Sequence, residues 1–174
     1  MKVVLLLRHA KSAWSQPGLD DHDRPLNRRG ERAAEAMADH IVRNAPRPDL
    51  ILCSTAARTR QTLAPLVHRL TAPAPPIALE RGLYLASEDA LLGRLRALAE
   101  EVGTVLLIGH NEGIGALAES LAGSGRATDL AALREKYPTG TLATLRAPAT
   151  LWTELAPGSA ELVSFVRPRD LLPE

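Results

Sequence analysis

An uninterrupted apolar run, Val3 to Leu7, stands near the start of this chain, and two charged residues, Arg8 and His9, follow it directly. Branched and leucine side chains without a polar interruption are typical of a strand buried on both faces, as in a parallel sheet covered by helices. Side chains just beyond the carboxyl end of such a strand face the crevice in which open α/β sheets bind ligands. The run therefore predicts an α/β fold and places an arginine and a histidine in its ligand crevice.

The order of strand and helix then repeats along the chain, which predicts a three-layer α/β/α sandwich with a mostly parallel central sheet and antiparallel edge strands. The expected strands span residues 2–8, 49–53, 77–80, 104–109, 141–146, 151–155 and 161–166, and the last two form a hairpin around Pro157-Gly158. The first expected helix starts at the N-cap Asn27 and ends before Pro46, and the second opens near Thr55 and is kinked or shortened by Pro65. The third runs from the N-cap Ser87 to about Val102. Two further helices are expected at 114–122 and 128–136.

The polar segment from His9 to Leu26 is long for a connection in a domain of this size. Connections of this length without regular structure are uncommon in compact domains and are often functional. We therefore expect this loop to line the rim of the site. Lys11 and Arg24 either add positive potential around the mouth or are ordinary surface charges.

Length and composition exclude several classes of protein. The chain has 174 residues, about one domain, and we expect a single domain over residues 1–174. The formal net charge is +1, from 21 basic and 20 acidic residues, and aromatic residues make up 3%, so no basic block or set of stacking platforms favours a nucleic-acid partner. The apolar stretch before Arg8 is too short for a signal peptide or a membrane span. A single cysteine, Cys53, fits a reducing compartment. We expect a cytoplasmic monomer without a membrane partner.

Three strand-end segments carry the residues of interest. Arg8 and His9 follow the first strand, Arg58 lies after the second, and His110 follows the strand at 104–109. Guanidinium groups bind phosphate oxygens through paired charge-assisted hydrogen bonds, each contributing roughly 1.5–3 kcal/mol net. A neutral imidazole can attack phosphorus, and a second imidazole, if protonated, can stabilise the charge on the phosphoryl oxygens. The set therefore predicts phosphate chemistry.

The motifs around these residues resemble a known superfamily. They are Leu7-Arg8-His9-Ala10-Lys11-Ser12, Asp21-His22-Asp23-Arg24-Pro25-Leu26, Arg29-Gly30, Ala57-Arg58-Thr59-Arg60-Gln61-Thr62 and Gly109-His110-Asn111. Together they are similar to the histidine phosphatase, or phosphoglycerate mutase-like, superfamily, and to its small phosphohistidine phosphatase branch of the SixA type. The resemblance covers most of the chain and implies the α/β sandwich described above.

The resemblance also implies roles for individual residues. In that family the first histidine is a nucleophile that becomes transiently phosphorylated, and this role falls to His9. Arg8, Arg58 and His110 correspond to the phosphate pocket, with Asn111 and Ser12 as secondary contacts. The implied enzyme is a phosphatase that needs no metal or other cofactor, and its partner is a histidine-phosphorylated protein or a small phosphorylated metabolite.

One departure from the superfamily concerns the proton donor to the leaving group. Many members carry a glutamate where this chain reads Glu80 to Ala86, and the acid position falls at Tyr84 or Leu85. A phosphohistidine imidazole leaves far more easily than an alkoxide, so the missing acid favours phosphoramidate substrates. The sequence leaves three other carboxylates open as the acid, namely Glu80, Asp21 and Asp23.

Other residues and other functions remain alternatives. Cys53 precedes Arg58 by four intervening residues, one too few for the loop of cysteine-dependent phosphatases, and is expected to be buried and inert. His40 and His68 lie in helical patterns and are expected to be structural or exposed, whereas His22 either is solvated or touches the substrate. A phosphatase for small phosphate esters or nucleotides and a non-catalytic phosphate-binding module are the competing functions.

Overall fold

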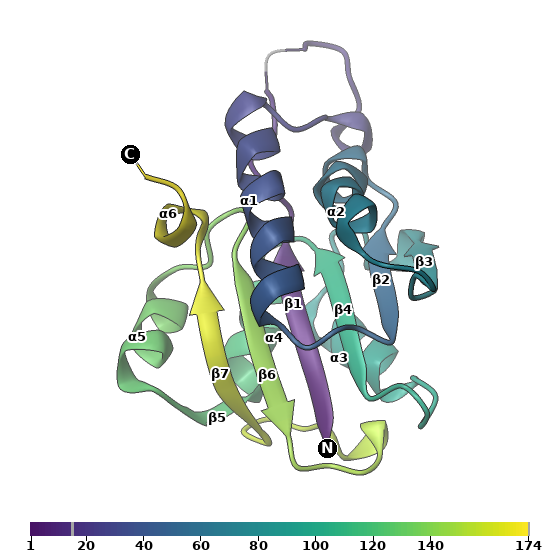
Figure 1. Cartoon of the computed structure of the whole chain (residues 1–174), viewed down its shortest axis with the longest axis vertical. Coiled ribbons are helices and arrows are strands. Elements are labelled where there is room, and N and C mark those ends of the chain that lie inside the picture. The colour runs from purple at the N-terminus through teal and green to yellow at the C-terminus, as the bar shows by residue number, and fades with distance from the viewer. Residues whose placement is uncertain (15, 174) are drawn as a thin grey trace.

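The strand-like runs of the sequence lie in one sheet in the computed structural model, which describes residues 1–14 and 16–173 (Figure 1). Ser15, within the predicted loop, and the terminal Glu174 lie outside the described residues. Within that described part, seven strands follow the order β3-β2-β4-β1-β6-β7-β5. The strands are β1 (Lys2–Arg8), β2 (Leu50–Ser54), β3 (Ile77–Glu80), β4 (Thr104–Gly109), β5 (Ala122–Gly125), β6 (Leu142–Ala147) and β7 (Ala160–Val166).

The register of β1 and β4 brings two of the predicted site segments together. These strands are parallel, and Arg8 pairs with Gly109 at their carboxyl ends. The residues that follow, His9 and His110, therefore leave the sheet side by side. β2 lies parallel to β4 on its other side, so the segment that leads to Arg58 reaches the same edge.

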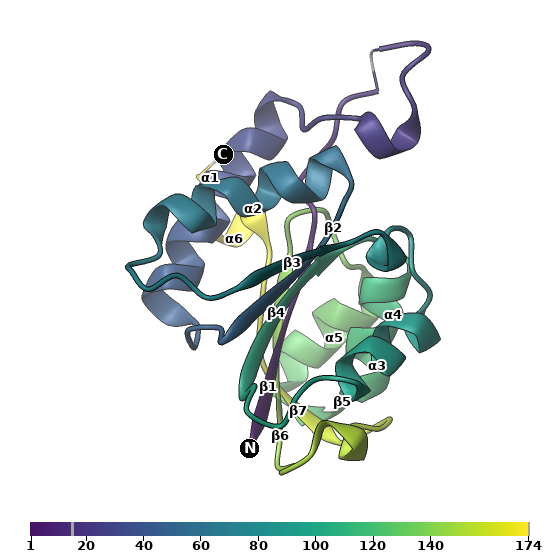
Figure 2. The ribbon, with the colours of Figure 1, turned by 90° about the vertical axis from the view of Figure 1, so that its right-hand side faces the viewer.

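Helices cover both faces of the sheet, which confirms the predicted three layers (Figure 2). α1 (Arg28–Asn44), α2 (Ala57–Arg69) and α6 (Pro168–Leu171) cover one face, and α3 (Glu88–Arg96), α4 (Gly113–Leu121) and α5 (Ala127–Glu135) cover the other. Alternate residues of β1 enter the two cores, since Leu5 packs with Met37 of α1 and Leu6 with Leu117 of α4. All four side chains are buried, and burying a side chain of this size stabilises the fold by roughly 1.5–3 kcal/mol.

The predicted helix starts are confirmed by their capping bonds. The side chain of Asn27 accepts from the Gly30 amide at 2.8 Å, and that of Ser87 accepts from the Ala90 amide at 3.1 Å. α2, however, continues past Pro65 to Arg69, so the prediction that Pro65 shortens this helix is wrong. Pro65 is buried, and the carbonyl that its missing N–H leaves free belongs to an exposed residue, Gln61, where water can replace the lost bond.

Two predicted elements are overridden by contacts across the chain. α3 ends at Arg96 rather than near Val102, and the amides of Leu98 and Val102 bond three residues back, to the carbonyls of Leu95 and Ala99 at 3.1 Å each, as in tight turns. The carbonyl of Val102 accepts from the Lys2 ammonium at 3.0 Å and from the Trp152 indole at 2.8 Å. The strand predicted at 151–155 is instead a 3₁₀ turn, η3 (Trp152–Glu154), because the indole of Trp152 turns inward and is buried.

The end of the chain also differs in its pairing from the predicted hairpin. β6 is an internal strand, antiparallel to both β1 and β7, and the described edges of the sheet are β3 and β5. β5 was not predicted, and it pairs parallel to β7. No helix among the described residues is long and apolar enough to cross a membrane.

Candidate active site

A pocket of about 420 Å³ opens at the carboxyl ends of β1, β2 and β4. The polar loop after β1 forms part of its rim, as predicted, with Lys11, Trp14 and Arg24 among the lining residues. Of the site residues predicted from the sequence, the pocket is lined by Arg8, His9, Ser12, Asp21, Arg58, His110 and Asn111.

The side chain of His9 is buried and fixed in one tautomer. Its Nδ1 lies 2.7 Å from the carbonyl oxygen of Ala10. A carbonyl oxygen only accepts, so Nδ1 carries the proton and Nε2 keeps its lone pair. Burial lowers the pKa of His9 to about 4, with the charges of Arg58 and Arg8 acting in the same direction and the bond to Ala10 opposing them. At neutral pH the ring is therefore uncharged, with a nucleophilic nitrogen.

His110 stands beside His9, with ring centroids 5.3 Å apart. Its Nε2 lies 2.8 Å from the Ser54 hydroxyl, while its Nδ1 is buried without a hydrogen-bond partner in the part of the chain that the structure describes. Burial, followed by the neighbouring His9 and Arg58, lowers the pKa of His110 to about 3. This ring is neutral at neutral pH, and in the tautomer whose Nε2 accepts from the Ser54 hydroxyl, Nδ1 carries the proton and can donate.

The two predicted arginines are anchored by the backbone and keep donors free. Arg8 donates from Nη1 to the carbonyl of Tyr137 at 2.7 Å, and Arg58 donates from Nη1 to the carbonyl of Asp21 at 2.7 Å. The Nε atoms of both arginines are buried and have no partner among residues 1–14 and 16–173. A buried donor without a partner is costly, and a ligand with several oxygens removes that cost. Buried cationic donors of this kind are typical of sites that bind anions.

Threonines at the start of α2 hold these segments in place. The Thr62 hydroxyl accepts from the Ala10 amide at 3.0 Å and donates to the Arg58 carbonyl at 2.7 Å, which ties the loop after β1 to α2. Thr59 donates to the Ser54 carbonyl at 2.8 Å and so closes the turn between β2 and α2. These bonds are buried, which keeps the site rigid.

Of the three carboxylates left open by the sequence, Asp21 alone is among the residues lining this described pocket. Burial raises its pKa, but hydrogen bonds from Tyr84, Arg24 and Arg58 outweigh burial and hold the pKa well below its usual range. Asp21 is therefore ionised at neutral pH and has no proton to give.

The other two carboxylates stand apart from the pocket. Glu80 accepts two bonds from Arg94, at 2.7 and 2.9 Å, and this partner lowers the pKa of Glu80. Asp23 is exposed and lies 3.6 Å from Nδ1 of His22. Neither carboxylate is brought to the His9 ring.

The predicted secondary contacts line the pocket but are engaged within the protein. The Asn111 side chain accepts from the Gly115 amide at 3.0 Å and donates to the Tyr137 carbonyl at 3.3 Å. The Ser12 hydroxyl accepts from Arg24 at 2.6 Å. Both residues thus support the loops around the site.

Several residues of the site were missed by sequence reasoning. Ser54 is the last residue of β2, as Arg8 is the last residue of β1, and that position at a strand end was an available signal. Tyr84 and Leu85 were singled out only as the position of the absent acid. In the structure Tyr84 donates from its hydroxyl to Asp21 and lies edge-on to His110, and Leu85 lines the pocket. Tyr137, whose carbonyl receives Arg8, comes from a segment that had no distinguishing pattern in the sequence.

The cysteine and the other histidines lie outside this arrangement. Cys53 is fully buried, and burial raises the pKa of its thiol to about 12, so it stays a thiol. His22 is half-buried, with Nε2 2.8 Å from the Thr55 hydroxyl, and His68 is exposed on α2. His40 bonds to Asn44 at 3.2 Å.

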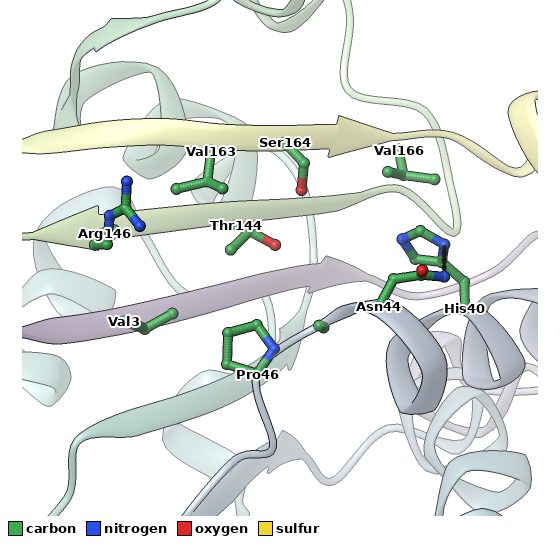
Figure 3. Close-up of a pocket in the computed structure, with 10 residues that line it drawn as sticks. Val3, His40, Asn44, Pro46, Thr144, Arg146, Val163, Ser164 and Val166 are labelled. Atoms are coloured by element: carbon green, nitrogen blue, oxygen red, sulfur yellow. Dashed lines mark hydrogen bonds between the residues drawn. The ribbon is translucent and has the colours of Figure 1, made fainter.

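Figure 3 shows a second hollow, of about 330 Å³, on the sheet face beside the end of α1, with His40 and Asn44 at one end. Its lining includes Thr144 and Ser164 from β6 and β7. Its cationic side chain, Arg146, is paired with Glu161 at 2.6 Å. This hollow therefore does not repeat the free buried donors found around His9.

Comparisons with known proteins agree with this geometry. The model of the histidine phosphatase superfamily (branch 1) matches residues 4–83. An uncharacterised protein of Mycobacterium tuberculosis is 42% identical over 166 residues, which cover 94% of this chain and 100% of the relative.

Two similar solved structures are described as candidate phosphohistidine phosphatases of the SixA type. The one from Agrobacterium tumefaciens is 36% identical, with a TM-score of 0.80, and the match covers 95% of this chain and 97% of that one. The one from Nakamurella multipartitia is 31% identical, with a TM-score of 0.82, and the match covers 97% of this chain and 96% of that one. The fold, the motifs and these relatives agree, and the chain belongs to the histidine phosphatase superfamily, in its SixA-type branch.

Proposed function

We propose that the protein is a phosphatase in which His9 takes the phosphoryl group from a phosphohistidine of a protein substrate. The observation that carries the proposal is a set of three buried nitrogen atoms without a partner among the described residues, Arg8 Nε, Arg58 Nε and His110 Nδ1, on side chains that line one pocket with a neutral His9. Three fixed donors and one nucleophile match a tetrahedral phosphoryl group that is attacked in line.

The reaction proceeds in two displacements at phosphorus. In the first, the lone pair of His9 Nε2 forms the new P–N bond while the substrate's P–N bond breaks and its electron pair stays on the leaving imidazole. In the second, water forms a P–O bond, the bond to His9 breaks, and the protons of the water end on phosphate and solvent. Arg8, Arg58 and His110 hold the phosphoryl oxygens through both steps and stabilise the charge that builds there.

The choice of phosphohistidine is supported by the carboxylates of the site. The carboxylate that lines the pocket, Asp21, is ionised and hydrogen-bonded, and Glu80 is occupied by Arg94. An alkoxide needs a proton as it leaves, whereas an imidazole protonated on its second nitrogen leaves as a neutral ring. A site without a protonated acid therefore favours the phosphoramidate.

The rim of the pocket supports the proposal that the phosphohistidine belongs to a protein. Trp14 and Leu85 line the mouth, and they are 79% and 55% exposed. Large exposed apolar side chains around a polar pocket are typical of a surface that meets another protein.

Metal independence is part of the same proposal. The positive charge that a metal would supply at the phosphoryl oxygens comes here from two guanidinium groups. We expect turnover to be unchanged by a chelator and by added Mg²⁺.

The test is a side-by-side comparison of kcat/KM on a histidine-phosphorylated protein, a phosphorylated sugar and a nucleotide. The proposal predicts that kcat/KM is at least about a hundredfold higher for the phosphohistidine protein than for either ester. General acid catalysis usually speeds ester cleavage by at least this factor, and this site lacks it. Equal or better turnover of either ester overturns the substrate assignment. No turnover of any phosphoryl donor by the folded protein overturns the phosphatase itself.

A further inference from the structure

A basic groove of about 630 Å³ lies beside the proposed active site. It runs between the first turns of α1 and the segment that contains α6, and Leu172 packs there against the cluster that includes Ala33. Lys11 and Thr139 line both the groove and the active-site pocket, so the two are adjacent. The cationic side chains of the groove are Lys11, Arg29, Arg32, Arg167 and Arg169.

The charge of this groove is local and largely uncompensated. The chain as a whole has a formal net charge of only +1. Arg167 is paired with Asp170 at 3.1 Å, but Arg29, Arg32 and Arg169 have no carboxylate within ion-pair distance among the described residues. The described residues that line the groove therefore carry a net positive charge in a concave space, which focuses its field on an approaching anion.

The arginines at the start of α1 stand where the helix dipole disfavours positive charge. Arg28, Arg29 and Arg32 lie in its first turns, and all three are exposed. The positive end of the helix dipole disfavours cations at that position and favours carboxylates, of which the first turn has only Glu31. The helix dipole thus gives these charges no stabilisation at this end of α1, which is consistent with a role in binding.

We propose that the groove binds an acidic segment of the phosphoprotein whose phosphohistidine enters the adjacent pocket. This inference rests on the proposed function of that pocket. The lining of the groove includes Pro138, Pro168 and Leu172, which offer apolar contact to an extended chain, while its arginines pair with carboxylates of that chain. Because such pairs stay partly solvated, they act mainly on encounter rate and KM and weaken with salt.

The experiment compares two peptides that carry the same phosphohistidine, one flanked by a run of glutamates and the other by glutamines. For the wild type at low salt, the glutamate peptide should have a KM about tenfold lower, with the same kcat, and the difference should shrink at high salt. The double variant Arg29→Gln/Arg32→Gln should raise the KM of the glutamate peptide about fivefold to tenfold and leave the glutamine peptide unchanged.

Arg28→Gln is the matched control, because it removes the same charge from the same turn of α1 but is not among the residues that line the groove. It should leave the KM of both peptides unchanged. Equal KM values for the two peptides with the wild type overturn the inference, and so does an equal effect of Arg28→Gln and the double variant.

Two further measurements separate the alternatives. The first is the KM of a doubly phosphorylated sugar for the wild type and the double variant. If the double variant raises this KM more than it raises that of the glutamate peptide, the groove binds a second phosphate group, and the proposal of an acidic segment is overturned. Fluorescence anisotropy of a labelled glutamate peptide without a phosphoryl group tests the groove independently of hydrolysis. If the wild type binds this peptide, the double variant does not, and neither phosphopeptide is hydrolysed by the wild type, the proposed function is contradicted. The proposal that the groove binds an acidic segment would still hold.

Discussion

His9 shows how a single backbone contact can decide which nitrogen of a ring is reactive. The carbonyl of Ala10 fixes the proton on Nδ1, and the surrounding burial and arginines keep the ring neutral. Replacing the ring by any other nitrogen or oxygen nucleophile would lose both the tautomer and the charge state. The proposed chemistry therefore depends on the position of this strand end as much as on the identity of the residue.

The lowered pKa of His9 gives a pH dependence with a definite sign. With a pKa of about 4, the ring is a neutral nucleophile above that pH and an inactive cation below it. We expect kcat/KM on a small phosphoramidate to stay flat from about pH 8 down to about pH 5 and to fall about tenfold per pH unit below about pH 4. If kcat/KM instead begins to fall near pH 6.5, the ordinary pKa of histidine, the site of the free enzyme does not lower the pKa of His9.

Arg58 is expected to contribute strongly to turnover, because it is 2% exposed and its Nε has no partner among the described residues. Arg58→Ala should lower kcat by roughly a hundredfold to a thousandfold, the usual loss for one preorganised charge-stabilising donor. Arg60→Ala is the control on the same helix, since Arg60 is exposed and bonds only to the Thr55 carbonyl among the described residues. Steady-state rates for both variants check this, and equal rates for Arg58→Ala and the wild type would remove Arg58 from the proposed phosphate pocket.

At the scale of elements, the turn between β3 and α3 lies where we propose that the leaving group departs. Leu85 lies in this turn, lines the pocket and adopts a left-handed backbone with φ of 52°, which costs a residue with a Cβ about 1–2 kcal/mol. It stands at one of the two positions where the sequence comparison with the superfamily places the missing acid.

Installing a carboxylate at this turn tests whether the missing acid limits the range of substrates. Leu85→Glu should raise turnover of a phosphate ester by at least about tenfold, because general acid catalysis is worth about 10²–10⁴ when well placed. Leu85→Gln, the neutral control, should not change it, and turnover of phosphohistidine should stay within about twofold in both variants because its leaving group needs no enzyme acid. Equal ester rates for the two variants would mean that something other than the acid excludes esters.

β5 illustrates a strand that depends on close backbone contact. A Cβ on Gly123 would overlap the carbonyl oxygen of Gly158, so the strand tolerates only glycine there. Gly123→Ala should lower the free energy of unfolding by about 1–3 kcal/mol with unchanged kcat, as overpacking usually does. Gly93 lies in α3 with open space where a Cβ would stand. Gly93→Ala should therefore raise the free energy of unfolding by up to about 1 kcal/mol, because alanine favours the helix more than glycine does. Thermal unfolding of the two variants checks both signs, and a stable Gly123→Ala would contradict the packing account.

The elements that could be predicted from the sequence are those whose signal is local. Val3 to Leu7 and the run at 104–109 are apolar throughout, and Asn27 and Ser87 cap the helices that follow them. β5 carries no such signal, because its sequence is Ala-Gly-Ser-Gly and its pairing comes from the distant β7. The turn at Trp152 likewise depends on the carbonyl of Val102, fifty residues away in sequence.

At the scale of the whole molecule, the site follows from parallel strands that end at one edge. Arg8 and Gly109 are paired across β1 and β4, so the meeting of His9 and His110 was predictable once the strands were taken as parallel neighbours. The partners of the carboxylates were not predictable, because Arg94 reaches Glu80, and Arg58 reaches Asp21, only through the fold. Sequence reasoning therefore placed the core of the site and left its acid unresolved.

The central claim is that phosphoryl transfer passes through His9, and trapping the phosphorylated protein tests it most directly. The wild type is mixed briefly with radiolabelled phosphoramidate and quenched in alkali, and the label on the chain is then measured before and after mild acid. The account predicts a label that is stable in alkali and lost in acid, and no label on His9→Ala that is folded by circular dichroism. Label on His9→Ala at the wild-type level, or a wild type that turns over phosphoramidate without ever becoming labelled, would contradict it.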